Sequence, residues 1–341
     1  MRAHTVILGA GATMAAIPSG DKNGKKSSVM NGMIHKLGME ELLQGVSLET
    51  KSENIEDIYS ELHSKPEYNA ITVEIEKRLY NYFDSMEIPE KPTIYDYLLL
   101  SLTSKDVVAT FNWDPLLIQA FVRCSRITEN LPRILCLHGN VAMGYCEEHR
   151  EFGTKDVVCP ICKKLLKPIN LLYPVKEKNY KSDDYINGCW DAVNFILENS
   201  YMITIFGYSA PTSDVEAVDL LRKAWGDKEN RQLEEVSVID IIEEDEMVSK
   251  WDDFIYSHHY RYTNNFFDSY LGMFPRRSCE TVFAMYSMNI PADGSKGFTS
   301  DMDWQDIESF IQDLLYQEYN TVEDKNVPLY YTAQSFLNNN K

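Results

Sequence analysis

The sequence contains no long apolar run. Nowhere do about 18 apolar residues follow one another, so no transmembrane helix is expected. The segment MRAHTVILGAG holds only a short apolar stretch interrupted by glycines, without a cleavage site behind a long apolar region, and it predicts no signal peptide. We therefore expect a cytoplasmic protein that does not associate with membranes.

Basic residues are also few. The chain has 33 Lys and Arg against 52 Asp and Glu, a formal net charge of −19. Such a charge repels a phosphate backbone at long range, so direct binding of nucleic acid is not expected. Any anionic ligand must be held locally by backbone dipoles. The acidic surface itself is typical either of a well-solvated protein or of a contact face for a basic partner.

Disulfides are not expected either. Seven cysteines, an odd number, in a chain without an export signal do not suggest a disulfide framework. Four of them lie in apolar contexts and are expected to be buried thiols, namely Cys124, Cys136, Cys189 and Cys279.

The remaining cysteines form a metal-binding motif. Cys146-x-x-His149 is followed after nine residues by Cys159-Pro-Ile-Cys162. Two ligand pairs with this spacing predict a tetrahedral Cys3His zinc site. Because four protein ligands leave no open position, the zinc would be structural.

Short apolar runs alternate with helical patterns along the chain. The predicted strands are 4–8, 106–110, 133–137, 202–206 and 236–241, and the clearest predicted helices are 114–123, 185–198 and 213–225. The strands are mostly continuous apolar runs, which suits burial on both faces. This order predicts an α/β fold class, a Rossmann-like doubly wound parallel sheet.

Two segments interrupt the alternation. Residues 20–95 are polar and helix-prone, and we interpret them as a helical insertion; residues 141–170 form the small zinc-binding module. Together with the sheet they make up one predicted domain over residues 1–243. The aromatic-rich segment 244–341 contains a predicted helix over 303–317 and is interpreted as a C-terminal extension for assembly.

Polar or glycine residues follow several predicted strands. They are Gly9, Asn112, His138, Gly207 and Asp240. In an open parallel sheet, ligands bind at the carboxyl ends of the strands, so we expect these five residues to converge.

The first strand runs into a glycine-containing loop, ILGAGATMAAIPSGD at 7–21. Gly9 and Gly11 before an Ala-rich helix would let backbone N–H groups approach a pyrophosphate. Met14 replaces the third glycine of a dehydrogenase fingerprint, and no second strand ends in an acid about 20 residues later. The loop therefore predicts phosphate binding without hydride transfer, with a tight turn that binds nothing as the alternative.

Two further stretches carry candidate chemistry. In LCLHGN, His138 would stand at a strand end as a catalyst or as a structural histidine. In FGYSAPTSDVEA, Gly207 and Ser209 could hold a second phosphate, while Ser213 or Asp214 fits a helix N-cap. Asp114 before Pro115 fits an N-cap as well.

In chain order these motifs resemble the sirtuin family. GAGATMAAIP at 9–18 resembles the family's G-A-G-x-S-x-x-x-G-I-P loop, TFNWD at 110–114 its T-Q-N-x-D strand end, and LHGN at 137–140 its catalytic His-Gly element. The zinc motif resembles the family's module with His149 in place of a Cys. FGYS at 206–209 resembles its G-T-S turn, and VIDI at 238–241 its late strand, with Asp240 where the family has a ribose-binding Asn.

The resemblance covers about residues 4–243 and has two departures. Ser19-Gly20-Asp21 stands where the family has Asp-Phe-Arg, and INLLYPVKEKNY at 169–180 lacks the Phe-Gly-Glu stretch beside which an acyl-lysine peptide adds as a strand. With these departures the chain looks like divergent bacterial sirtuin-like proteins that destroy NAD during phage infection. Some of those act with a separately encoded, hexameric HerA-type translocase ATPase.

The resemblance implies that NAD+ is the substrate and is hydrolysed to nicotinamide and ADP-ribose. Asn112 would hold the nicotinamide ribose or the attacking water, His138 would act as general base, and Asp114 would fix the nicotinamide pocket. Asp240 would accept the adenosine ribose hydroxyls. The diphosphate would be held by Gly9, Ala10, Gly11, Ala12, Thr13, Gly207 and Ser209.

Two other functions remain open at this point. One is NAD+-dependent protein lysine deacylation, and the other is a non-catalytic sensor or scaffold that binds NAD or ADP-ribose. We also expect a homo-oligomer.

Overall fold

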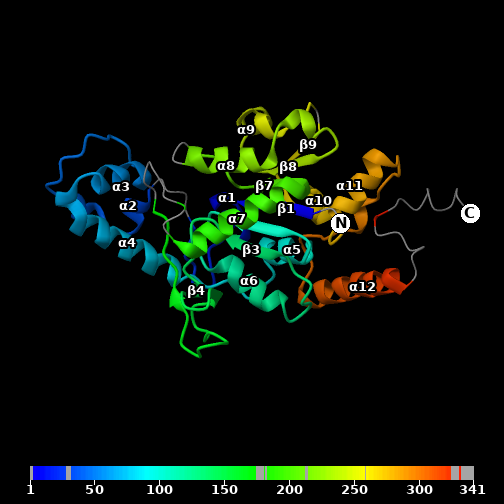
Figure 1. Ribbon diagram of the computed structural model, residues 1–341, viewed down its shortest axis with the longest axis horizontal. Helices are drawn as coiled ribbons and strands as arrows, with labels where there is room; N and C mark the ends of the chain where they lie inside the picture. The colour runs from blue at the N-terminus through cyan, green and yellow to red at the C-terminus, as the bar shows by residue number, and fades with distance from the viewer. Residues whose placement is uncertain are drawn as a thin grey trace, which may run out of the picture.

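A central parallel sheet organises the molecule (Figure 1). The computed structural model describes residues 3–27, 32–173, 180, 183–211, 214–257, 259–323 and 330–331. Six strands lie in the order β3-β2-β1-β7-β8-β9, and each neighbouring pair is parallel. Their bounds are β1 Ala3–Leu8, β2 Val107–Thr110, β3 Arg133–Cys136, β7 Ser200–Phe206, β8 Glu235–Ile239 and β9 Tyr260–Thr263. The predicted fold class is confirmed.

Burial explains which strands could be predicted. β2, β7 and β8 are buried along their whole length, so both faces are mostly apolar and the sequence shows a nearly continuous apolar run. β9, by contrast, is the half-buried edge strand YRYT, and its sequence does not stand out from its surroundings. It comes from within the predicted extension 244–341, and the boundary after residue 243 stays a prediction.

Helices cover both faces of the sheet. Val6 and Leu8 of β1 belong to the apolar cluster of α1 (Ala10–Ala16), α5 (Ile94–Leu100) and α6 (Leu116–Cys124). Ile7 points the other way, into the cluster of α7 (Asp184–Asn199), α8 (Val215–Trp225) and α9 (Glu244–Trp251). The alternation along β1 therefore divides the core into two layers.

Helix starts differ slightly from the predictions. Pro115, not Asp114, is the N-cap position of α6, although Asp114 Oδ1 still accepts a hydrogen bond from Leu116 N at 3.1 Å. Asp214 is the N-cap residue of α8, but its side chain makes no capping hydrogen bond; the carboxylate accepts instead from the Tyr208 hydroxyl at 3.0 Å. Ser213 lies outside the described residues.

The segment 20–95 contains a helical lobe, seen at the left of Figure 1. Its helices are α2 (Met33–Lys36), α3 (Ile55–His63) and α4 (Asn69–Asp84), with short 3-10 turns at Glu40–Leu43 and Pro66–Tyr68. Ile55, Leu62 and Leu79 are fully buried in the same apolar cluster as Leu8 of β1. The lobe is thus joined to the core beside α1 and α5.

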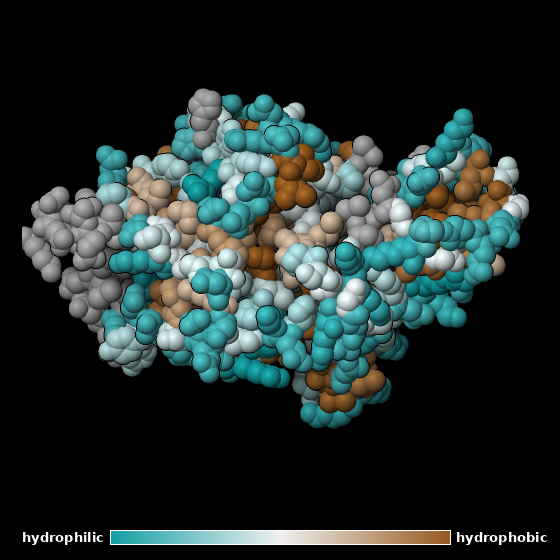
Figure 2. All heavy atoms as spheres, turned by 180° about the vertical axis from the view of Figure 1, so that it is seen from behind, coloured by the Kyte–Doolittle hydropathy of each residue, from teal (hydrophilic) through white to brown (hydrophobic). Residues whose placement is uncertain are grey.

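The zinc-binding module protrudes next to the helical lobe, where Lys155 of the module binds Asp84 of α4. Its three antiparallel strands lie in the order β5-β4-β6, with bounds β4 Met143–Cys146, β5 Glu151–Thr154 and β6 Lys167–Pro168. The lower protrusion in Figure 2 carries apolar atoms, and the exposed apolar side chains of the module are Phe152, Val157, Val158, Ile161 and Leu165.

The C-terminal part is folded onto the same body. It contains α10 (Tyr270–Met273), α11 (Ser278–Ser287) and α12 (Trp304–Glu323). The predicted helix 303–317 corresponds to α12, which continues beyond residue 317 because nothing in its sequence ends it there. Further 3-10 turns occur at Lys228–Asn230, Asp252–Phe254, Phe266–Asp268 and Gly294–Lys296.

The sequence predicts neither a membrane-spanning helix nor a disulfide framework. Among the described residues, no helix combines the length and the apolar character needed to span a membrane. All seven cysteines are free thiols, and the four predicted to lie in the core, Cys124, Cys136, Cys189 and Cys279, are buried.

Candidate active site and metal centre

The five residues that follow the strands lie along one edge of the sheet. Backbone hydrogen bonds continue from each strand into the next: Gly9 N donates to Phe206 O at 3.1 Å, Leu137 N to Thr110 O at 2.9 Å, and Gly207 N to Ile239 O at 3.0 Å. Because the strands are parallel and adjacent, these bonds hold the strand ends in register. Gly9, Asn112, His138, Gly207 and Asp240 therefore occupy a common edge.

The glycine loop is tightly packed against the end of β7. Gly11 N donates to Gly207 O at 2.9 Å, and Ala12 N donates to Gly9 O at 3.0 Å. Gly207 has a φ of +60°, and a Cβ there would lie 2.2 Å from Ala12 N. The glycines are thus required by the close approach of two backbones. The N–H groups of Gly9, Gly11 and Ala12 all bind protein carbonyls.

A buried network fixes the Asn112 side chain. Its Nδ2 donates to Gly9 O at 2.8 Å and to Thr13 Oγ1 at 3.0 Å. The Thr13 hydroxyl donates to Asp114 Oδ2 at 2.7 Å. It also lies 2.6 Å from the Tyr95 hydroxyl, and because Thr13 has only one proton to donate, Tyr95 is the donor in this second hydrogen bond. Thr13 is saturated by three protein partners, so in this structure it positions Asn112.

Tyr95 was missed in the sequence. It lies inside the apolar run IYDYLLL of α5, where a tyrosine is an ordinary core residue, and only its contact with Thr13 reveals another role. Burial and the nearby Asp114 charge raise the pKa of Tyr95 well above its usual value, so it remains a neutral donor.

Asp114 is a buried acid that holds this loop together. Burial raises the pKa of Asp114, although hydrogen bonds from Thr13 and Leu116 N favour its charged form. Its backbone carbonyl accepts from Asn140 Nδ2 at 2.6 Å. Asn140 is the last residue of the LHGN stretch, and it ties the Asp114 loop to the His138 loop.

His138 lies among aromatic rings. Phe111 contacts its ring edge-on at a centroid distance of 4.7 Å, Tyr180 stacks at 6.1 Å, and Asp214 Oδ1 lies 4.0 Å from His138 Nε2. Asn112 is 9% and His138 5% exposed. Both side chains are therefore almost fully buried, and Phe111 and Tyr180 form an aromatic cover on His138.

A cavity of about 510 Å³ opens at the carboxyl ends of β1, β7 and β8. Its lining includes Gly11, Gly207 and Asp240, but neither Asn112 nor His138. One oxygen of Asp240, Oδ1, accepts from Ile241 N at 2.8 Å and Ile242 N at 3.0 Å. Ser209 is exposed and does not line the cavity, in contrast to Gly11 and Gly207.

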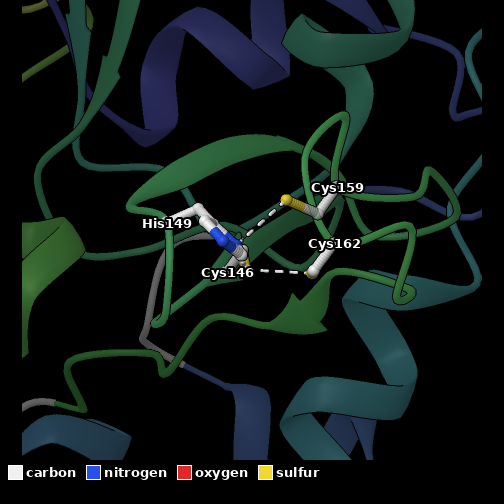
Figure 3. A group of neighbouring side chains, drawn as sticks. All are labelled: Cys146, His149, Cys159 and Cys162. Carbon is white, nitrogen blue, oxygen red and sulfur yellow. Dashed lines mark hydrogen bonds between the residues drawn. The ribbon is translucent and has the colours of Figure 1, made fainter.

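The four predicted metal ligands converge, as Figure 3 shows. Their ligand atoms all lie within 4.8 Å of one another. Cys146 Sγ lies 3.6 Å from His149 Nδ1 and 3.8 Å from Cys162 Sγ, and Cys159 Sγ lies 3.7 Å from His149 Nδ1. A tetrahedron with Zn–S bonds of about 2.3 Å has edges of about 3.8 Å, so the set fits zinc.

The backbone around Cys159 favours its thiolate form. Burial raises the pKa of Cys159, but hydrogen bonds from the amides of Cys162 and Ile161 outweigh it and bring the value to about 7. Among the described residues, this is the only group of three or more His, Cys, Asp and Glu side chains close enough to hold a metal ion. With four protein ligands the site is suited to a structural role.

Comparisons with known proteins give only distant similarity. No family model matches the chain, and no curated protein sequence matches it. The chain is similar to a solved structure described as Sir2 bound to acetylated peptide, with 17% identity, a TM-score of 0.37, and coverage of 76% of this chain and 87% of that one. It is also similar to a solved complex of a Sir2 homologue with NAD, with 14% identity, a TM-score of 0.36, and coverage of 76% of this chain and 83% of that one. At such low values the similarity carries no argument about function.

Proposed function

We propose that this chain hydrolyses NAD+ to nicotinamide and ADP-ribose. The observation that carries the proposal is the pairing of two features at one sheet edge. One is a nucleotide-sized cavity lined by Gly11 and Gly207, and the other is Asn112, which is bonded to Gly9 of the same glycine loop and, through Asn140, to the loop of His138. Ligand cavities of about 300–1,000 Å³ are usual, and 510 Å³ suits a nucleoside diphosphate that extends partly outside it. The sirtuin-like motifs supply the choice of NAD+.

The chemistry requires little from the protein. Nicotinamide leaves NAD+ as a neutral molecule from a cationic glycoside, so no general acid is needed, and positive charge develops on the ribose. What remains is to hold the ribose, position a water and accept its proton.

Asn112 is suited to the positioning task. Its Nδ2 is directed into the glycine loop, and its Oδ1 accepts no hydrogen bond from the described residues. That oxygen can accept from a ribose hydroxyl or from the attacking water. Because the network around Thr13 and Tyr95 holds the amide in place, the oxygen is oriented before substrate arrives.

His138 is suited to accept the proton. Asp214 at 4.0 Å would stabilise the imidazolium that forms. The aromatic cover of Phe111 and Tyr180 must shift when the nicotinamide ribose enters, and once closed it would exclude bulk water.

Asp240 and the zinc site complete the assignment. Oδ1 of Asp240 is held by two backbone amides, which leaves Oδ2 to accept adenosine ribose hydroxyls. Zinc held by Cys146, His149, Cys159 and Cys162 would stabilise the module without taking part in the reaction.

The proposed biological role is that of an antiphage effector. We propose that NAD+ loss acts in abortive infection, in the cytoplasm, and that the chain works as a homo-oligomer with a HerA-type ATPase. The support is the motif resemblance of residues 4–243 alone. Measurement of particle mass with and without such an ATPase would test the assembly.

The activity itself has a direct test. Purified protein, alone and with the candidate ATPase, is incubated with NAD+, and nicotinamide and ADP-ribose are quantified by chromatography. We expect Asn112→Ala and His138→Ala each to lower the rate by about a hundredfold or more, with unchanged circular dichroism. Gln232→Ala, at an exposed position, is the matched control.

Two outcomes would replace the proposal. Formation of O-acyl-ADP-ribose only in the presence of an acylated peptide would indicate a deacylase. Tight binding of ADP-ribose without any turnover would indicate a sensor or scaffold.

A further inference from the structure

The nucleotide cavity is short of positive charge. Its described lining contains one acidic side chain, Asp240, and one basic side chain, Lys26. The glycine-loop amides of Gly9, Gly11 and Ala12 already donate to protein carbonyls. In a chain of net charge −19, a diphosphate in this cavity needs a cation, and Lys26 is the one that the described lining offers.

The backbone of Lys26 is held on two sides. Its carbonyl accepts a hydrogen bond from the Tyr82 hydroxyl of α4 at 2.6 Å and another from Lys36 Nζ of α2. The helical lobe thus fixes where the Lys26 side chain leaves the main chain.

The turn before Lys26 is also anchored. Asp21 is buried, and its Oδ1 accepts from Asn23 N at 2.9 Å and Lys25 N at 2.8 Å. Its Oδ2 accepts from Glu87 N at 3.0 Å, which ties the turn to the segment after α4. Lys26 therefore follows a rigid turn, and little ordering is required to present it.

Neighbouring lysines are already engaged, whereas Lys26 is not. Lys22 Nζ lies 3.4 Å from Glu90 Oε1, and Lys25 Nζ binds Ser85. The ammonium of Lys26 makes no hydrogen bond or ion pair with the described residues, and it lines the cavity. Its charge is available to a ligand.

We propose that Lys26 binds the diphosphate of the nucleotide, so that the helical insertion supplies the charge that the glycine loop does not. A lysine acts on phosphate as a point charge and needs no fixed bidentate geometry. Asp240 in the same cavity repels phosphate and attracts ribose hydroxyls, so the two charges set the direction in which the nucleotide lies. This inference rests on the proposed function, since it takes the ligand to be a nucleoside diphosphate.

Calorimetric titration with ADP-ribose tests the inference without turnover. We expect Lys26→Met to weaken binding about tenfold or more, the range for loss of a charged hydrogen bond. Raising the salt concentration from about 50 to about 300 mM should weaken binding to the wild type more than to Lys26→Met, because screening acts on the charge that the variant lacks. Lys26→Arg should retain most of the affinity.

Lys22→Met is the control, because Lys22 lies on the same turn but does not line the cavity. It should bind as the wild type does. If Lys26→Met keeps both the affinity and the salt dependence of the wild type, Lys26 does not bind the phosphates, and the proposed function stands. If the wild type itself does not bind ADP-ribose, the inference fails, while the NAD+ hydrolysis assay described above decides the proposed function separately.

Discussion

At the scale of single residues, the site depends on side chains that orient one another. Asn112 could be singled out from its position after a strand, but its orientation is set by Thr13 and Tyr95, which come from two other parts of the chain. Tyr95 lies 82 positions from Thr13 and still contacts its hydroxyl at 2.6 Å. No local pattern contains that pairing.

The Tyr95 hydroxyl can be removed without changing the packing. In Tyr95→Phe, Thr13 loses a donor and Asn112 loses a neighbour at 3.3 Å, so the amide is held less firmly. We expect NAD+ hydrolysis to fall about fivefold, mainly in kcat, since a buried hydrogen bond contributes on the order of 1 kcal/mol.

Tyr97→Phe is the matched control on the same helix. Its hydroxyl donates to Met302 O at 2.9 Å, away from Asn112, so its loss should affect thermal stability alone. Equal rates in the wild type and Tyr95→Phe would contradict a positioning role for Tyr95.

At the scale of elements, the zinc module is a small unit, and packing of its own side chains stabilises it only in part. Its three strands are short, and five of its large apolar side chains are exposed, so its apolar core is small. In such a unit a bound metal would replace the missing core.

Metal content and stability of the module should therefore change together. We expect one zinc per chain by elemental analysis, and we expect Cys162→Ser to lose it and to expose β4–β6 to limited proteolysis. Cys189→Ser, which changes a buried thiol outside the ligand set, should retain the metal. Full zinc occupancy in Cys162→Ser would rule out the four-ligand site.

At the scale of the whole molecule, the C-terminal segment belongs to the body of the fold. Ile307, Ile311 and Leu314 of α12 are buried in the same cluster as Leu8 of β1. Arg276 binds Glu318 through two hydrogen bonds, of 2.6 and 3.0 Å, which fixes α12 to the segment before α11. An assembly role for the segment 244–341 is compatible with this arrangement and stays a prediction.

Shortening a buried side chain of α12 should lower the stability of the entire molecule. Ile311 is fully buried, and Ile311→Ala is expected to reduce the free energy of unfolding by about 2–5 kcal/mol. Thermal melting measures this loss. Tyr319→Ala, at a residue 65% exposed on the same helix, should change the melting temperature little, and a comparable drop there would argue against the packing described.

The sequence by itself determined the parallel α/β class, the group of four candidate metal ligands and the positions of Asn112 and His138 at strand ends. Burial on both faces forces continuous apolar runs, and the metal requires ligands at close spacing; both leave local patterns. Only the tertiary structure decided that Gly9, Gly11 and Ala12 use their amides within the protein, that Tyr95 and Asn140 hold the loops around Asn112, and that Lys26 of the helical insertion lines the cavity. These are contacts between segments far apart in the chain, and such contacts are fixed by packing and carry no periodicity of their own.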